Sequence, residues 1–309
     1  MATAVKRVIA RPMSAGAPSG VPLPDRLHVI RQYRRSFGRL RFGIRPRRFS
    51  ELLLAKMLWD RDPLLPITTE KVDARGFVAS RVGTDYLIPL LQVSDRAERI
   101  DLDALPARFA IKASHGCGFN LLVGDKSQID AEALRATLRG WLATDWYRRH
   151  REWAYRGVPR RILVEALLVD HGELAADYKF YVFNGRARMV MVNGRSAVAA
   201  VAPKGGRHPT RDYFDERWQP LRVERGKPRA AVTPPRPDRL AEMIDVAERI
   251  ARGFAFCRVD LYNVEGRIYF GEITHYPSAG QQMFRPLDFD AALGEVWLHG
   301  TPIPQRFYA

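Results

Sequence analysis

Residues 256–274 read FCRVDLYNVEGRIYFGEIT, and this run says more about the fold than any other part of the chain. Apolar and polar residues alternate on both sides of the glycine at 266, which is typical of two half-buried antiparallel strands. We expect a three-residue loop over 264–266, with Asn263 paired to Arg267. In this register one face carries four polar side chains: Arg258, Asp260, Glu272 and Thr274. Asp260 and Glu272 are then diagonal neighbours, about 7–8 Å apart at Cα.

Two carboxylates at that separation can converge on Mg²⁺, which takes one or two protein carboxylates and completes its shell with water and phosphate. Asp260 and Glu272 are therefore candidate metal ligands. The alternative is a solvated polar face on which Arg258 simply pairs with Glu272.

The composition is that of a globular protein large enough for one large domain or two to three modest ones. The chain has 309 residues, 46% of them hydrophobic, and no apolar run approaches the ~18 residues that span a bilayer. Its two cysteines, Cys117 and Cys257, lie far apart in the sequence, which fits a reducing cytoplasm better than a disulfide scaffold.

The positive charge is concentrated near the start of the chain. The formal net charge is +16, and residues 31–48 contain eight arginines and no acid. This segment predicts contact with a polyanion or with an anionic membrane surface, and no specific nucleic acid is expected. The alternative is a solvated basic arm. Residues 1–25 are rich in Ala, Pro, Ser and Gly and are expected to be a flexible tail.

A candidate phosphate-binding loop follows an apolar strand expected at 109–113. Lys112 lies at its end, and residues 114–118 read SHGCG. Small residues such as Gly116 and Gly118 let backbone N–H groups approach phosphate, and a lysine adds a mobile charge. The spacing is not that of a Walker loop. His115 is either a structural hydrogen-bond partner or a catalytic group.

Two further motifs lie between this loop and the late hairpin. Residues 177–192 predict a hairpin with a two-residue turn at Asn184-Gly185, which places Asp177, Lys179 and Tyr181 on one face with Arg186 and Arg188. Glu165 ends an apolar strand and precedes Ala166-Leu167-Leu168. A carboxylate beside exposed backbone at a strand end can bind an adenine amino group. Solvated surface positions are the alternative for both motifs.

Taken in chain order, these motifs resemble the ATP-grasp superfamily and, within it, the TupA-like ATP-grasp family, which is named for teichuronopeptide biosynthesis. The resemblance covers roughly residues 45–295. It rests on Ile111-Lys112 with His115-Gly116-x-Gly118-x-Asn120, Glu152-Trp153-x-Tyr155, Glu165, Asp177-Tyr178-Lys179-Phe180 with Phe183-Asn184-Gly185, Arg258-Val259-Asp260 and Gly271-Glu272-x-Thr274.

This resemblance implies an α+β fold in which two lobes clamp ATP between antiparallel sheets, after a basic helical pre-ATP-grasp region. The boundaries we expect are a tail at 1–25, the N-terminal region at 26–105, the ATP-grasp domain at 106–295 with lobes at about 106–170 and 171–295, and a C-terminal tail at 296–309.

The resemblance also implies roles for individual residues. Those expected to bind ATP are Lys112, His115, Gly116, Gly118, Glu165, Leu167, Asp177 and Lys179. Asp260 and Glu272 would hold Mg²⁺, and Arg258 and Lys179 would be catalytic. Thr274 stands where ATP-grasp enzymes usually have Asn, which puts a second Mg²⁺ in question, and Cys117 stands where Ser is expected.

The implied reaction joins a carboxylate to an amine through an acyl phosphate, with release of ADP. The family suggests a uronic acid of a cell-surface polysaccharide as the acid and an amino acid or peptide as the amine, in the cytoplasm or at the inner membrane surface. The alternatives are an ATP-grasp kinase, a glycosyltransferase using Asp101-Leu102-Asp103, and a non-enzymatic polyanion-binding module.

Overall fold

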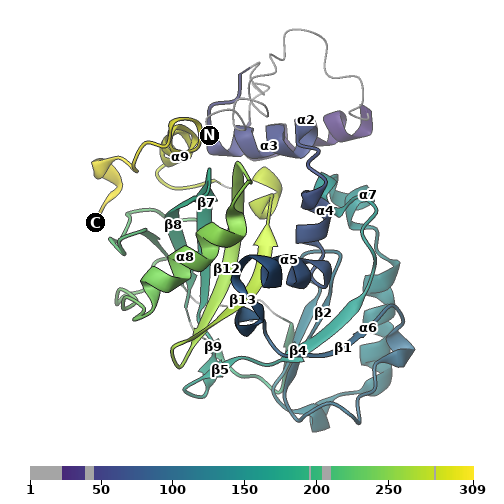
Figure 1. Ribbon diagram of the computed structural model, residues 1–309. Coiled ribbons are helices and arrows are strands. Elements are labelled where there is room, and N and C mark those ends of the chain that lie inside the picture. Colours follow the sequence, from purple (N-terminus) through teal and green to yellow (C-terminus); the bar gives the residue numbers. More distant parts are fainter. Residues whose placement is uncertain (1–22, 39–44, 195, 204–209, 282) are drawn as a thin grey trace.

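The computed structural model describes residues 23–38, 45–194, 196–203, 210–281 and 283–309 (Figure 1). They form two five-stranded antiparallel sheets with helices packed on them, and the expected α+β fold class is confirmed. The first sheet has the strand order β1-β4-β2-β3-β10, and the second has the order β11-β8-β7-β12-β13. A small third sheet has the order β5-β6-β9.

The strands are short in the first sheet and longer in the second. The first sheet contains β1 (Leu90–Ser94), β2 (Phe109–Ala113), β3 (Asn120–Val123), β4 (Ile162–Ala166) and β10 (Val201–Pro203). The second contains β7 (Asp177–Phe183), β8 (Arg186–Asn193), β11 (Arg211–Asp215), β12 (Phe256–Val264) and β13 (Arg267–Thr274). The third contains β5 (Val169–Asp170), β6 (Glu173–Leu174) and β9 (Ser196–Ala197).

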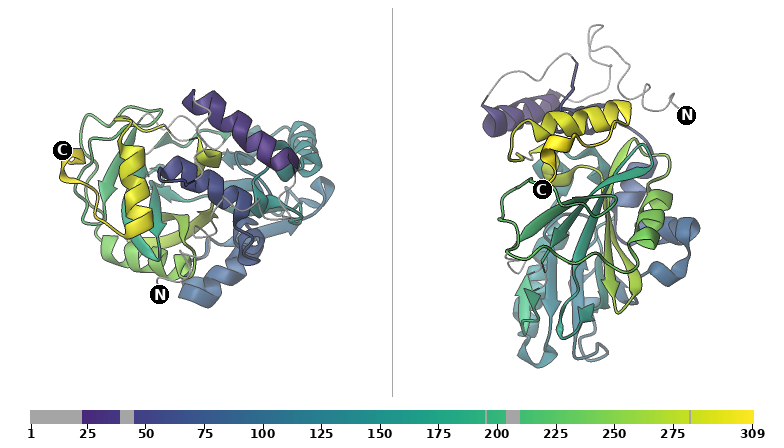
Figure 2. Two further views of the ribbon diagram at one scale, coloured as in Figure 1. Left: turned by 90° about the horizontal axis from the view of Figure 1, so that it is seen from above. Right: turned by 90° about the vertical axis from the view of Figure 1, so that its left-hand side faces the viewer.

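The helices lie at one end of the second sheet and on the faces of both sheets (Figures 1 and 2). Those at the end of the second sheet are α2 (Leu23–Phe37), α3 (Phe49–Trp59) and α9 (Phe289–His299). On one face of the second sheet α8 (Leu240–Ala251) packs, with α5 (Asp73–Val82) beside it. The first sheet is covered by α6 (Ala131–Ala143). The shorter α4 (Leu64–Thr69) and α7 (Trp146–His150) complete the set.

Alternation along the strands gives the second sheet two different faces. One face buries apolar side chains against α8, including Phe180, Val190 and Val259. On the other face Tyr181 and Phe256 join an aromatic core with residues of α3 and α9. Farther along β12 that same face becomes charged, so the polar site lies beside the aromatic core.

The register of the late hairpin differs from our expectation. The turn has two residues, Glu265 and Gly266 (φ 49° and 81°), and Val264 pairs with Arg267. A bulge at Gly271 then shifts the register by one residue, so Asp260 pairs directly with Glu272. The predicted loop and the diagonal relation are wrong. Because the bulge adds a second one-residue shift to that of the shorter turn, the four polar side chains still share a face, as expected.

The earlier hairpin is also interrupted by a bulge. Asn184-Gly185 forms the predicted two-residue turn, and Phe183 pairs with Arg186. The register then shifts between Tyr181 and Val182, so Tyr181 lies opposite Met189. Arg188 is the extra residue of this bulge, and it pairs with Glu216 at 3.6 Å.

The start of the chain is only partly described. Residues 1–22, which make up most of the expected tail, lie outside the described residues, as do Arg39 and Arg41 of the arginine-rich segment. Of the rest of that segment, Arg31, Arg34 and Arg35 belong to α2. None of the helices that the structure describes is long and apolar enough to cross a membrane.

Candidate active site

The register of the second sheet lines up polar side chains from neighbouring strands. One row across the sheet holds, in order, Met191, Lys179, Asp260 and Glu272. The next row holds Met189, Tyr181, Arg258 and Thr274. Because side chains at paired positions stand on the same face, these two rows bring together residues that are far apart in the sequence.

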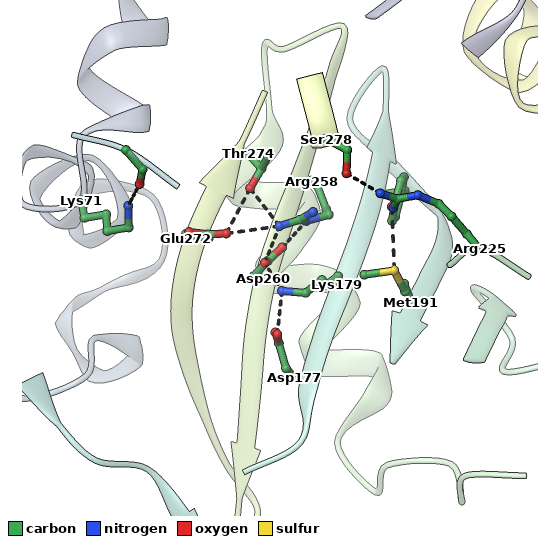
Figure 3. Close-up of polar contacts among 12 residues, drawn as sticks. Lys71, Asp177, Lys179, Met191, Arg225, Arg258, Asp260, Glu272, Thr274 and Ser278 are labelled. Atoms are coloured by element: carbon green, nitrogen blue, oxygen red, sulfur yellow. Dashed lines mark hydrogen bonds and ion pairs between the residues drawn. The ribbon is translucent and has the colours of Figure 1, made fainter. Parts of the chain in front are cut away.

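Asp260 is at the centre of this group (Figure 3). Its Oδ1 accepts a hydrogen bond from Arg258 Nε at 2.6 Å, and its Oδ2 accepts one from Arg258 Nη2 at 2.7 Å and another from Lys179 Nζ. Asp260 is only 2% exposed. Burial raises the pKa of this carboxyl group, and the charges of Arg258 and Lys179 oppose that rise. The bidentate geometry is that of a charge-assisted pair.

The remaining members are held by the same two cations. Lys179 Nζ lies 2.6 Å from Asp177 Oδ2. Arg258 Nη2 donates to Glu272 Oε1 at 3.2 Å and to Thr274 Oγ1 at 3.0 Å. Burial alone would lower the pKa of Arg258, but Asp260 and its neighbours hold it well above its ordinary value. Arg258 is therefore a permanent cation within this cluster.

The donor set suits a hard divalent cation. Asp260, Glu272 and Thr274 offer carboxylate and hydroxyl oxygens, which are the atoms that Mg²⁺ prefers. The Glu272 side chain is 29% exposed, so it is the more accessible of the two carboxylates. Among the described residues there is no group of three or more His, Cys, Asp or Glu side chains arranged to hold a metal ion. Such a two-carboxylate site fits Mg²⁺ that keeps water and phosphate among its ligands.

The first sheet contributes a second ion-paired group. Lys112 Nζ donates to Glu165 Oε2 at 2.5 Å, and Arg75 Nη1 of α5 donates to Glu165 Oε1 at 2.9 Å. Lys112 and Glu165 are both buried, and they lie on the face of the sheet that does not pack on α6. Glu165, to which the resemblance assigns a role in ATP binding, thus lies between two cations.

The glycine-rich segment forms the loop between β2 and β3. His115 is buried, and its Nε2 lies 2.9 Å from the carbonyl oxygen of Trp141 in α6. Burial lowers the pKa of His115, so the neutral ring is favoured. Lys71 Nζ donates to the carbonyl oxygen of Gly116 at 2.7 Å. The backbone at Gly118 has φ +79°, which favours glycine.

Other candidate residues occupy connecting segments or turns. Leu167 lies half-buried in the link between β4 of the first sheet and β5 of the third. Asp101 Oδ1 accepts from the backbone N–H groups of Asp103 and Ala104, so this acidic pair stabilises a turn. Such a local role gives no support to the glycosyltransferase alternative.

Glu152, the first residue of the Glu152-Trp153-x-Tyr155 motif, is buried. Trp146 Nε1 donates to Glu152 Oε1 at 3.0 Å, and burial raises the pKa of Glu152 to about 7. Burial raises the pKa of the neighbouring Tyr155; the charges of Glu152 and Glu272 raise it further, and Arg258 opposes them.

Sequence reasoning missed several polar residues around the site. They are Lys71, Arg75 and Arg225, of which Arg225 Nη2 donates to Ser278 Oγ. None of the three belongs to a hairpin, and no periodicity or turn motif marks them.

A family model described as TupA-like ATPgrasp matches residues 51–298. The chain belongs to this family. Membership confirms the resemblance seen in the motifs, that of an ATP-grasp protein. The two buried clusters just described are thus those of a TupA-like ATP-grasp protein, one cluster on each sheet.

Several solved structures are similar to this TupA-like chain at low identity. The ATP-grasp ligase PsnB complexed with a minimal precursor matches with 11% identity over 80% of this chain and 67% of its own, with a TM-score of 0.40. The D-alanine–D-alanine ligase from Bacillus anthracis complexed with ATP matches with 13% identity over 68% of this chain and 54% of its own, with a TM-score of 0.37. The D-cycloserine synthetase DcsG matches with 16% identity over 76% of this chain and 72% of its own, with a TM-score of 0.43. The chain thus spans about half of that D-alanine–D-alanine ligase. No curated protein matches the chain.

Proposed function

We propose that this TupA-like protein uses Mg²⁺ and ATP to join a carboxylate to an amine through an acyl phosphate. The observation that carries the proposal is the position of Arg258, which contacts Asp260, Glu272 and Thr274 together. A guanidinium fixed among metal-binding oxygens is placed to bind a substrate carboxylate or the phosphorylated group formed from it.

Lysines from both sheets support phosphate binding. Lys112 comes from β2 of the first sheet and Lys179 from β7 of the second, and both are buried. We assign both to the ATP phosphates, with His115, Gly116 and Gly118 supplying the loop around them. Glu165 and Leu167 are assigned to the adenine, and Asp177 to the ribose or phosphate side. Lobes at about 106–170 and 171–295 remain our proposed division of the ATP-grasp domain.

In the proposed reaction a carboxylate oxygen attacks the γ-phosphorus of ATP, and the bond to the β–γ bridging oxygen breaks to release ADP. The amine nitrogen then attacks the acyl carbon, phosphate leaves, and the nitrogen loses a proton. Mg²⁺, held by Asp260, Glu272 and Thr274, would neutralise phosphate charge when bound. Arg258 orients the acid and stabilises developing negative charge, while Lys179 keeps a positive charge beside Asp260.

The family resemblance supports a uronic acid carboxylate of a surface polysaccharide, or of its precursor, as the acid. An amino acid or a peptide would supply the amine. The test is an ADP-release screen with Mg·ATP, in which uronic acids and amino acids are added singly and in pairs. We expect release that requires one acid and one amine together. Release that depends on a single hydroxyl compound would instead favour a kinase.

A further proposal concerns α2, which combines exposed apolar and basic side chains. Leu23, Leu27 and Ile30 are 66%, 43% and 42% exposed, and Arg31, Arg34 and Arg35 follow on the exposed surface. A helix face of this kind fits the boundary of an anionic membrane. We propose that the enzyme works in the cytoplasm, where ATP is available, with α2 at the inner membrane surface.

A further inference from the structure

Arg225 lies on a segment at the edge of the second sheet, next to the face that carries the charged cluster. This segment follows β11, and its first residues are anchored there: the backbone N–H of Leu221 donates to Tyr213 at 2.8 Å, and Val223 is buried in the aromatic core shared with α3 and α9. The carbonyl oxygen of Arg225 accepts from Arg211 Nη1 at 3.0 Å. The backbone position of Arg225 is therefore fixed next to the face that carries Asp260.

The guanidinium of Arg225 is surrounded by cations and hydroxyl groups. Burial lowers its pKa, and the nearby charges of Arg211 and Arg258 lower it further, while Tyr181 and Tyr213 oppose them. No carboxylate among the described residues pairs with Arg225. A partly buried cation without an anionic partner has a high electrostatic free energy, which an anion at this position would reduce.

Two hydroxyl groups face the same place. Arg225 Nη2 donates to Ser278 Oγ, so the Ser278 hydroxyl lies against the guanidinium. Ser278 and Ala279 both have left-handed backbone, with φ 50° and 51°, which is strained for residues with a Cβ. The hydroxyl group of Tyr213 is buried without a well-aligned hydrogen-bond partner among the described residues.

The position within the site distinguishes a substrate group from a nucleotide phosphate. Lys71, which holds the glycine-rich loop, and Arg225 lie on opposite flanks of the carboxylate cluster (Figure 3). The loop and Lys112 are on the side assigned to ATP. An anion at Arg225 would therefore belong to a substrate on the other side of Arg258.

We propose that Arg225, Ser278 and Tyr213 bind the α-carboxylate of the amine substrate, which makes that substrate a free α-amino acid. One carbon atom separates the amine of an α-amino acid from its carboxylate, so a carboxylate held at Arg225 keeps the amine close to the acyl group at Arg258. This inference rests on the proposed ligase function and names the class of its second substrate.

Calorimetric titration of the full chain saturated with Mg·ADP tests the inference. The probes are a panel of L- and D-amino acids and the matching carboxamides. We expect at least one amino acid to bind, with its carboxamide at least about ten-fold weaker, because a charge-assisted hydrogen bond is lost. Arg225→Gln should weaken the same amino acid by at least about ten-fold, and Arg225→Lys should weaken it less.

The controls separate this inference from the function on which it rests. Arg222→Gln removes an exposed arginine three residues earlier and should bind the amino acid like the wild type. The affinity for Mg·ADP, measured first for every variant, should stay within about two-fold, which also shows that the fold is retained. Equal binding of acid and carboxamide, unchanged binding by Arg225→Gln, or no binding by a protein that takes Mg·ADP overturns the inference alone. A wild-type protein that binds no Mg·ADP overturns the proposed function and the inference with it.

Discussion

At the residue scale, the cluster on the second sheet is a set of ion-paired charges. Asp177, Asp260 and Glu272 share the two cations Lys179 and Arg258, and each carboxylate has a cation within 3.2 Å. Removing one member of a buried ion pair typically costs about 3–5 kcal/mol, since the partner charge is left behind. The same residues therefore stabilise the fold locally and, in the proposed reaction, supply oxygens and cations to the substrates.

Substitution of the two metal-type carboxylates should have different consequences. Glu272→Gln should reduce ADP release by at least about 100-fold with little change in stability, because its side chain is partly exposed. Asp260→Asn should reduce ADP release as much and also lower the free energy of unfolding, because Arg258 and Lys179 lose their buried partner. Asp245→Asn, on the exposed face of α8, is the control. Near wild-type ADP release by Glu272→Gln would show that Glu272 is not a metal ligand.

Glu152 should make stability depend on pH. Burial raises its pKa from 4.5 to about 7, so between these values the folded protein holds a proton that the unfolded chain releases. Stability should therefore fall as pH rises from about 4.5 to 7 and then level off, by at most about 3 kcal/mol from this group. Glu152→Gln should flatten this part of the profile in denaturant unfolding from pH 5 to 8. Parallel profiles for the two proteins would contradict the assignment.

At the element scale, the late hairpin shows which parts of a site can be predicted from sequence. Alternation identified two strands, and it correctly placed Arg258, Asp260, Glu272 and Thr274 on one face. The register could not be read in the same way, because a glycine can support either a turn or a bulge, and here Gly266 does one and Gly271 the other. The shorter turn and the bulge each shift the register by one residue in the same direction, and a total shift of two keeps these four side chains on one face.

These two glycines should respond differently to substitution by alanine. At Gly271 a Cβ would lie 2.9 Å from the Tyr262 ring and 3.1 Å from the carbonyl oxygen of Asp260. Gly271→Ala should therefore disturb the Asp260–Glu272 pairing and reduce ADP release strongly. Gly266 has open space but φ +81°, so Gly266→Ala should cost about 1–2 kcal/mol of stability while ADP release by the folded protein persists. Equal losses of activity would show that the bulge does not position the site.

At the scale of the whole molecule, the residues that sequence reasoning missed are those that tertiary packing brings in. Lys112 and Glu165 stand in strands with recognisable patterns, and both were singled out. Arg75 reaches Glu165 from a helix 90 positions earlier, and Arg225 reaches Ser278 across 53 positions. Nothing in the local sequence marks such contacts, because they depend on how helices and loops pack against the sheets.

The attachment of α2 makes the proposed membrane contact testable. Asp25 accepts a hydrogen bond from Tyr147 of α7 at 2.6 Å, which fixes one face of the helix and leaves the apolar and basic face outward. Replacing Arg31, Arg34 and Arg35 by Gln should lower the affinity for phosphatidylserine-containing vesicles by roughly 100-fold, because each basic residue contributes about 1 kcal/mol of binding free energy. The loss is measured by co-sedimentation and should be clearest at low salt. Replacing the exposed Arg96, Arg99 and Arg139 is the matched control. Equal binding by both triple variants would leave α2 as a solvated basic surface.

The central claim is that the cluster around Arg258 phosphorylates a carboxylate with ATP. Hydroxylamine reacts with acyl phosphates to give hydroxamates, and phosphate esters of hydroxyl groups do not react in this way. Incubation of the protein with Mg·ATP, hydroxylamine and a panel of uronic acids should therefore give a hydroxamate in proportion to the ADP released, and Arg258→Gln should give none. ADP release without hydroxamate, with the transferred phosphate stable on a hydroxyl group, would identify a kinase and contradict the account.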